Sequence, residues 1–214
     1  MKLNSDKTKY MITNFCKSTQ FKTRIYLENT LLEQVRQTKL LGVIISDDFT
    51  WHSNTKMIVH KAYTRIIMLR KLCEFNVGTT DLLQIYILYI RSVLEQSCVV
   101  WANAITEQEK MDIERIQKTS LKIIYKESYK CYENALTISK LPSLTERRSK
   151  LVLKFALKCV KHERTAVMFP KNKVVKTTRH SEEYKVPYAK TERYKNSAIP
   201  SMARLLNENE SKLK

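Results

Sequence analysis

The stretch LLQIYILYIRSVLEQSCVVWA, Leu82–Ala102, decides the class of fold. When it is wound as a helix, apolar side chains cover most of its circumference, which is typical of a helix that is buried on several sides. We expect this helix to run from Thr79 or Thr80 to about Ala104 and to form the core of a helical region. No apolar run in the chain reaches the roughly 18 residues that span a bilayer, so we expect no membrane partner.

A second helix is expected before this stretch. Ser53 and Asn54 are good N-caps, and the helical period that follows them lasts to about Phe75. Gly78 then stands where a left-handed residue would end the turn.

Two capping boxes mark helix starts after the core stretch. Thr106 with Glu109, and Ser143 with Glu146, have the spacing at which each side chain accepts a hydrogen bond from the other residue's backbone N–H. Pro142 ends one helix just before the second box. We expect helices over residues 106–125, 132–140 and 143–162.

Residues 8–46 show a different pattern, rich in β-branched and aromatic residues, and are predicted to form short strands with a hairpin turn at 28–30. Elsewhere the scarcity of glycine, only Gly42 and Gly78, favours helix. The sequence therefore predicts a mainly α fold, with a small antiparallel β-hairpin region at the N-terminus, a helical bundle and a basic tail. The expected domains are 1–50, 51–163 and 164–214, the last poorly ordered with a weak helix at 200–209.

The charge of the chain indicates its class of partner. Thirty-nine basic and twenty-one acidic residues give a formal net charge of +18. Residues 108–214 alone hold twenty-five basic and twelve acidic residues. Such an excess favours a polyanion, and nucleic acid is the commonest one.

The basic residues form stripes on two of the expected helices. On a helical wheel they lie opposite the apolar side chains of the same helix. An ordinary solvated face mixes the two signs of charge, whereas these stripes are nearly all positive. We expect them to contact phosphates, with mere solubility as the alternative. The residues are Arg115, Lys118, Lys122 and Lys126 on the first helix, and Arg147, Lys150, Lys154 and Lys158 on the second.

Asp47 and Asp48, in SDDFTW after an apolar run, raise the question of a polymerase metal site. A two-metal site needs carboxylates from separate strands, and consecutive strand residues point to opposite faces. We therefore interpret the pair as a polar turn that leads into a helix. The five scattered cysteines lack zinc-site spacing, and a lone Cys159–His162 pair falls short of four ligands, so we expect reduced thiols and no metal site.

Several ordered motifs together resemble a known family. The chain is similar, from about Lys2 to Pro170, to the C-terminal part of the reverse transcriptases of non-LTR retrotransposons, of the LINE and jockey type. The matching stretches are KLNSDKTKYMI (2–12), TKLLGVIISDDFTW (38–51), YILYIRSVLEQSCVVW (86–101), ERIQKTSLKIIY (114–125) and YENALTISKLPSLTERRSKLVLKFALKC (132–159).

The resemblance implies roles for two short motifs. Asn4, Lys7 and Thr8 match the family's Asn-x-x-Lys-Ser/Thr pattern, in which the lysine is thought to assist at the polymerase site. Leu41, Gly42 and Val43 match the primer grip, where glycine would allow close approach of the backbone. The helices after Trp51 would correspond to the thumb and the region beyond it.

The same resemblance places the catalytic aspartates upstream of the first motif, so we expect this chain to begin after them. The expected function is that of an RNA-directed DNA polymerase fragment that has no catalytic residues and is not an enzyme as given. It would need no cofactor, although the parent enzyme would use Mg²⁺. The expected partner is an RNA or DNA duplex, bound independently of sequence inside the cell, in the nucleus or cytoplasm. The alternatives are a helical protein-interaction module without nucleic-acid function and, least favoured, an active nuclease or polymerase that uses Asp47 and Asp48.

Overall fold

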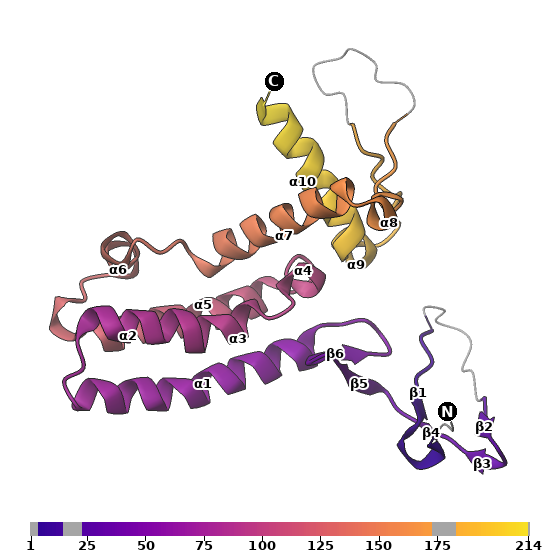
Figure 1. Ribbon diagram of the computed structural model, residues 1–214, viewed down its shortest axis with the longest axis horizontal. Coiled ribbons are helices and arrows are strands. Elements are labelled where there is room, and N and C mark those ends of the chain that lie inside the picture. The colour runs from indigo at the N-terminus through magenta and orange to yellow at the C-terminus, as the bar shows by residue number, and fades with distance from the viewer. Residues whose placement is uncertain (1–3, 15–22, 173–182, 214) are drawn as a thin grey trace. The chain divides into compact units, whose positions relative to one another are not determined.

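The structure is a computed structural model that describes residues 4–14, 23–172 and 183–213 (Figure 1). The chain divides into two compact units, residues 1–57 and 58–214. Most of the described residues are helical, and the named strands all lie in the first unit. This confirms the mainly α fold with a small strand region at the N-terminus. The first unit extends to residue 57, beyond the boundary expected at residue 50.

Short strand pairs make up the first unit. Strand β1 pairs in parallel with β4, whereas the pairs β2–β3 and β5–β6 are antiparallel. The antiparallel hairpins were expected, whereas the parallel pairing of β1 with β4 was not. The expected hairpin turn is present at Glu28 and Asn29, both of which have positive φ. The elements are η1 Ser5–Lys7, β1 Lys9–Tyr10, β2 Tyr26–Leu27, β3 Thr30–Leu31, β4 Glu33–Gln34, β5 Gln37–Leu40 and β6 Val43–Ser46.

Helices make up the second unit, and the first of them begins within unit 1. In chain order they are α1 His52–Glu74, α2 Thr79–Ile85, the π-helical η2 Tyr86–Arg91, α3 Ser92–Glu95, α4 Cys98–Trp101, α5 Glu107–Tyr125, the 3₁₀ turn η3 Lys126–Ser128, α6 Tyr132–Ser139, α7 Leu144–Lys161, α8 Glu163–Ala166, α9 Glu192–Lys195 and α10 Ala198–Leu213.

The core stretch is buried as expected, but it is not one continuous helix. It passes through the π-helical η2 and breaks at Ser97, which adopts the left-handed conformation between α3 and α4. Leu88 and Tyr89 are exposed, so the helix is not buried on all sides. At the break, the Gln96 carbonyl still has a hydrogen-bond partner, because the indole N–H of Trp101 donates to it at 3.0 Å. The fully buried side chains of this stretch are Leu82, Tyr86, Ile90, Leu94 and Trp101.

The ends of α1 differ from the expected caps. The helix begins at His52, and Asn54 is buried, where its Oδ1 accepts a hydrogen bond from the Ile44 N–H of β6 at 3.1 Å. At the other end, the left-handed residue is Asn76 and not Gly78. Gly78 has an extended conformation and serves as the N-cap of α2. Asparagine tolerates the left-handed conformation almost as well as glycine, which explains the exchange of roles.

The helices predicted from the capping boxes are confirmed at α5 and α7. The reciprocal box of Thr106 and Glu109 is complete, and the Ser143 hydroxyl accepts from the Glu146 N–H at 3.2 Å. Helix α6 also lies where it was expected.

The C-terminal segment is more ordered than predicted. Residues 173–182 of the expected tail lie outside the described residues. Helix α10 packs against α7 and α4 and buries Met202, Ala203 and Leu206. Before it, Lys171 and Tyr184 form an antiparallel bridge, and Asn207 on α10 holds that bridge in place. The Asn207 amide both donates to the Tyr184 carbonyl and accepts from the Tyr184 N–H, at 2.9 Å each.

Within the second unit, α2, α3 and α5 lie between α1 (from residue 58) and α7, and α10 packs on α7 (Figure 1). This layering buries the apolar face of α1 and of α7 against neighbouring helices. Among the helices of the described residues, none has the length and hydropathy needed to cross a membrane.

The burial of Leu94 gives a first testable prediction. Leu94→Ala should lower the free energy of unfolding by about 2–5 kcal/mol, because truncation leaves a cavity in a fully buried site. Lys190→Ala, at an exposed position, should change it by less than about 0.5 kcal/mol. Urea unfolding followed by circular dichroism measures both, and equal effects would contradict this assignment of the core.

Candidate nucleic-acid interface

Helix α7 presents a row of exposed lysines. Lys150, Lys154 and Lys158 lie on the side of the helix opposite its buried positions. Lys150 forms an ion pair with Glu146 at 2.6 Å, one turn away. Neither Lys154 nor Lys158 forms an ion pair with an acidic residue of the described segments, so both charges face solvent uncompensated. The buried positions are Leu144, Arg148, Val152, Ala156 and Cys159.

Helix α5 carries the second row of basic residues. Arg115 is paired with Asp112 at 2.9 Å, and the Lys118 ammonium lies 5.0 Å from the centroid of the Tyr132 ring. Lys122 is exposed and forms no ion pair within the described part of the chain. The row lies opposite the apolar side of α5, as the sequence predicted.

Two of the basic residues that were expected to contact phosphates bind other groups of the protein. The ammonium of Lys126 donates to the Cys73 carbonyl at the end of α1, at 3.0 Å, and the Lys126 backbone has a positive φ of 45° at the C-cap of α5. Arg147 donates to Glu95 at 3.2 Å, and the same carboxylate oxygen lies 3.3 Å from Arg91. These contacts connect helices, so Lys126 and Arg147 are less available to a phosphate than the rest of the set.

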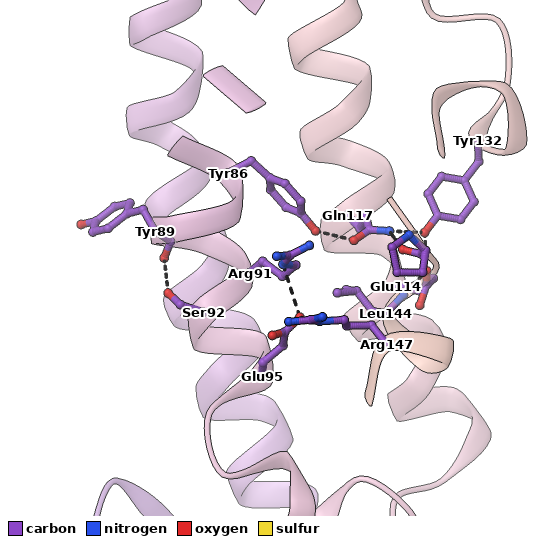
Figure 2. A network of polar contacts seen from close by, with 11 residues as sticks. Tyr86, Tyr89, Arg91, Ser92, Glu95, Glu114, Gln117, Tyr132, Leu144 and Arg147 are labelled. Carbon is purple, nitrogen blue, oxygen red and sulfur yellow. Dashed lines mark hydrogen bonds and ion pairs between the residues drawn. The ribbon is translucent and has the colours of Figure 1, made fainter. Parts of the chain in front are cut away.

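A network of polar side chains connects α5 to α6 and α7 and thereby fixes where the lysine rows lie (Figure 2). The Tyr86 hydroxyl donates to Gln117 at 2.6 Å, and the Gln117 amide donates to the Tyr132 hydroxyl at 2.9 Å and to the Pro142 carbonyl at 3.0 Å. The Tyr132 hydroxyl in turn donates to Glu114.

Glu114 also caps α7 from a neighbouring helix. Its carboxylate accepts from the Leu144 N–H at 3.0 Å and from the Thr145 N–H at 3.3 Å. These are two of the backbone donors that a helix N-terminus leaves unpaired, and a negative charge there is stabilised by the helix dipole. The capping glutamate therefore joins α5 to the first turn of α7.

Burial decides the protonation of this network. Burial and the hydrogen bond to Glu114 raise the pKa of Tyr132, and burial raises the pKa of Tyr86 well above its ordinary value. Both tyrosines therefore stay protonated and act as donors. Arg148 is only 3% exposed, and burial lowers the pKa of its guanidinium while nearby Glu114 opposes that change.

The sequence did not identify the polar core. Gln117 and Arg148 stand at inward positions of amphipathic helices, and Glu114 lies away from the basic stripe of α5. A polar residue at an otherwise apolar helical position is the only signal that could have revealed these residues.

The two family-matched motifs lie in the first unit. Asn4 caps the 3₁₀ turn η1 by accepting from the Lys7 N–H at 3.2 Å, and the Thr8 hydroxyl donates to the Asn4 carbonyl at 2.7 Å. The Lys7 residue is exposed. This pattern of residues therefore forms a capped turn whose lysine is free to reach solvent.

Leu41 and Gly42 form the tip of the β5–β6 hairpin, and Val43 is buried at the start of β6. Both tip residues have positive φ, 49° and 87°, as in the two-residue turns that suit hairpins. The left-handed conformation explains why position 42 is a glycine, whether or not a ligand approaches the backbone closely there. Leu41 is 89% exposed, so its side chain packs against little of the part of the chain that the structure describes.

Asp47 and Asp48 follow β6 in a turn. The Asp48 Oδ1 accepts from the Ser46 hydroxyl at 2.7 Å, the Thr50 N–H at 2.9 Å and the Thr50 hydroxyl at 2.9 Å. These contacts hold the polar turn that the sequence predicted. Across the described segments, no group of three or more His, Cys, Asp or Glu side chains is arranged to hold a metal ion.

The cysteines described by the structure are not joined in disulfides. Cys73, Cys98 and Cys159 are buried, Cys131 is exposed, and Cys16 lies outside the described residues. Burial, with a smaller contribution from the Glu95 carboxylate, raises the pKa of the Cys98 thiol to about 11.

No protein-family model, no curated protein and no solved structure matches the chain.

The capping role of Glu114 gives a second prediction. Glu114→Gln keeps the shape of the side chain but removes its charge and turns an amide donor toward the donors of α7. The free energy of unfolding should fall by about 1.5–3 kcal/mol, as is typical when a charged acceptor is lost. The matched control is Glu133→Gln at an exposed position of α6, which should change stability by less than about 0.5 kcal/mol. Equal urea-unfolding midpoints for the two variants would contradict the capping role.

The thiol of Cys98 gives a third prediction. Its pKa is 9.0 for the ordinary group and about 11 in the folded protein, so the unfolded chain loses this proton first as the pH rises. The contribution to stability is complete below pH 9 and disappears between about pH 9 and pH 11, a loss on the order of 2 kcal/mol. In urea unfolding at pH 8 and pH 10.5, Cys98→Ala should lose less stability than the parent over this interval. Cys131→Ala, at an exposed site, should follow the parent, and identical pH dependence of all three proteins would refute the assignment.

Proposed function

We propose that the second unit binds double-stranded nucleic acid through the exposed lysines of α5 and α7, independently of base sequence. The observation that carries this proposal is that Lys122, Lys154 and Lys158 are exposed and form no ion pair within the described segments. Uncompensated cations in rows along helices suit a partner with regularly spaced negative charge, and phosphates on a duplex provide that spacing. Lys118 and Lys150 extend the two rows.

The network around Glu114 supports this proposal because it makes the rows rigid. Helix α5 is joined to α6 and to the first turn of α7 by hydrogen bonds between buried or half-buried groups. Lysines on rigid helices lose less conformational freedom on binding than lysines on mobile segments, so more of the electrostatic attraction appears as affinity.

The resemblance to non-LTR reverse transcriptases agrees with such a role. In that setting the chain would hold an RNA or DNA duplex beside a polymerase site and would not itself catalyse nucleotide transfer. The engagement of Asp48 in its own turn favours binding over catalysis by Asp47 and Asp48. A cytoplasmic or nuclear location follows from the proposal, because the duplex would be found there.

The salt dependence of binding gives a fourth prediction. Phosphate contacts position a protein without reading sequence, so a 20-base-pair RNA–DNA hybrid and a DNA duplex of unrelated sequence should bind with similar affinity. Four or five contacts imply a slope of about −4 in a plot of log K against log salt concentration, since each contact contributes roughly 0.9. Fluorescence anisotropy at several NaCl concentrations measures the slope.

The triple variant Lys122→Glu, Lys154→Glu, Lys158→Glu should flatten this slope by about 3 and leave the helical circular dichroism unchanged. The control variant Lys185→Glu, Lys190→Glu, Lys195→Glu changes the net charge equally, at exposed positions of the C-terminal segment. If both variants weaken binding to the same extent, net charge alone attracts the duplex. The protein-interaction module would then replace the proposed function.

A further inference from the structure

The segment that precedes α10, residues 184–195, has a packed side and an exposed side. It leads through α9 into α10 (Figure 1). Lys185, Tyr188 and Lys190 are exposed, whereas the side chains next to them along the chain are buried or half-buried. One set of side chains therefore packs on the fold, and the other set is presented to solvent. The packed set is Tyr184, Val186, Pro187 and Ala189.

Two tyrosine rings of this segment are left in solvent. Tyr188 is 83% exposed, and Tyr194 on α9 is 48% exposed. Aromatic side chains usually contribute a large apolar area to a core or to an interface, and these two rings contribute little to the core of the described residues. Their faces are therefore available to a flat aromatic group of a partner.

The segment is positively charged. Residues 184–195 contain four basic residues and a single acidic one, Glu192. Glu192 is paired with Lys195 at 2.9 Å. Lys185 and Lys190 form no ion pair with an acidic residue of the described segments. Along the chain, the exposed Tyr188 ring thus lies between two exposed cations whose charges no acidic side chain offsets.

Contacts at both ends hold this segment on the fold. At its start, Tyr184 is joined to Asn207 of α10 by two hydrogen bonds of 2.9 Å. At its end, the Thr191 hydroxyl caps α9 by accepting from the Tyr194 N–H at 3.3 Å, and α9 packs against α10. A partner that binds the exposed side chains has less backbone to order than on a free tail, so less affinity is lost to ordering.

A single-stranded nucleic acid offers both of the groups that this surface can bind. Its unstacked bases present flat faces to aromatic rings, and its phosphates pair with lysines. A duplex keeps the faces of its bases stacked inside the helix, so it offers the rings no such partner. An acidic peptide would pair with the lysines but would leave the two rings without flat groups to stack on.

We propose that Tyr188 and Tyr194 stack on bases of a single-stranded nucleic acid, whose phosphates pair with Lys185 and Lys190. Every base has an aromatic face, so the site accepts strands of any sequence. It uses no lysine of α5 or α7 and therefore does not rest on the proposed function. A duplex gains no stacking at this site, which keeps its lysines suitable as control positions for duplex binding.

Comparison of two strands of equal charge tests the stacking. Fluorescence anisotropy measures the binding of the full chain to a 12-nucleotide oligo(dT) and to an abasic strand with the same number of phosphates. The parent should bind the oligo(dT) at least about tenfold more tightly, because only that strand offers bases to the two rings.

Variants that keep every charge assign the stacking to the two tyrosines. Tyr188→Ala with Tyr194→Ala should lower the affinity for oligo(dT) at least about tenfold, to that of the abasic strand. Tyr188→Phe with Tyr194→Phe keeps both rings and should bind like the parent. The matched control Tyr26→Ala with Tyr63→Ala removes two exposed tyrosines elsewhere and should also bind like the parent. Circular dichroism verifies that all three variants are folded.

Three results would overturn this inference. The first is equal affinity of the parent for the oligo(dT) and the abasic strand, and the second is parent-like binding of oligo(dT) by the double alanine variant. The third is an equal loss of affinity for a 20-base-pair duplex in that variant, because the rings would then not select single strands.

The same measurements keep this inference apart from the proposed function. If the parent binds no duplex but prefers oligo(dT) and loses this preference with the two rings, the proposed function fails and the single-strand site stands. If the parent binds the duplex and shows no preference for oligo(dT) over the abasic strand, the proposed function stands and the single-strand site fails.

Discussion

The carboxylate of Glu114 is the contact on which the arrangement of the second unit depends. It accepts from two backbone N–H groups at the start of α7 and from the Tyr132 hydroxyl, so one side chain of α5 connects three helices. Around it, Gln117 uses both its carbonyl and its amide, to Tyr86 on one side and to Tyr132 and Pro142 on the other. Such a network stabilises only while every member is satisfied, which makes it specific for one arrangement of the helices.

This arrangement separates two populations of basic residues. Arg91, Arg147 and Lys126 are used inside the molecule, to join α3 to α7 and to complete the end of α1. Lys122, Lys154 and Lys158 are exposed and form no ion pair within the described segments. The net charge of the chain therefore overstates the number of cations that a partner can reach, and the distribution of acidic residues among the helices decides which ones remain.

Local rules explain what the sequence could predict. The capping boxes at Thr106 and Ser143, and the turn at Glu28 and Asn29, depend on residues three or four positions apart, and each lies where it was expected. The break at Ser97 was not predicted, because serine has no strong preference for the left-handed conformation and the supporting contact, from the Trp101 indole to the Gln96 carbonyl five residues earlier, follows no standard capping pattern. Asn54 had the right chemistry for a cap, yet its tertiary contact with Ile44 determines its role. Within the basic stripes, the wheel gave the side of each helix correctly but not the partners from other helices, Glu95 for Arg147 and the Cys73 carbonyl for Lys126.

The bridge between Lys171 and Tyr184 has a consequence for changes in chain length. The Asn172 N–H donates to the Glu183 carbonyl at 2.9 Å, and the Lys185 N–H donates to the Pro170 carbonyl at 2.8 Å, so the two ends of the intervening segment are fastened side by side. Asn207 fastens the Tyr184 end in turn to α10. The entropy of closing a loop grows only with the logarithm of its length once its ends are held. An epitope or a small fluorescent domain inserted between these ends would add little strain, because the anchor points that face α10 would stay in place.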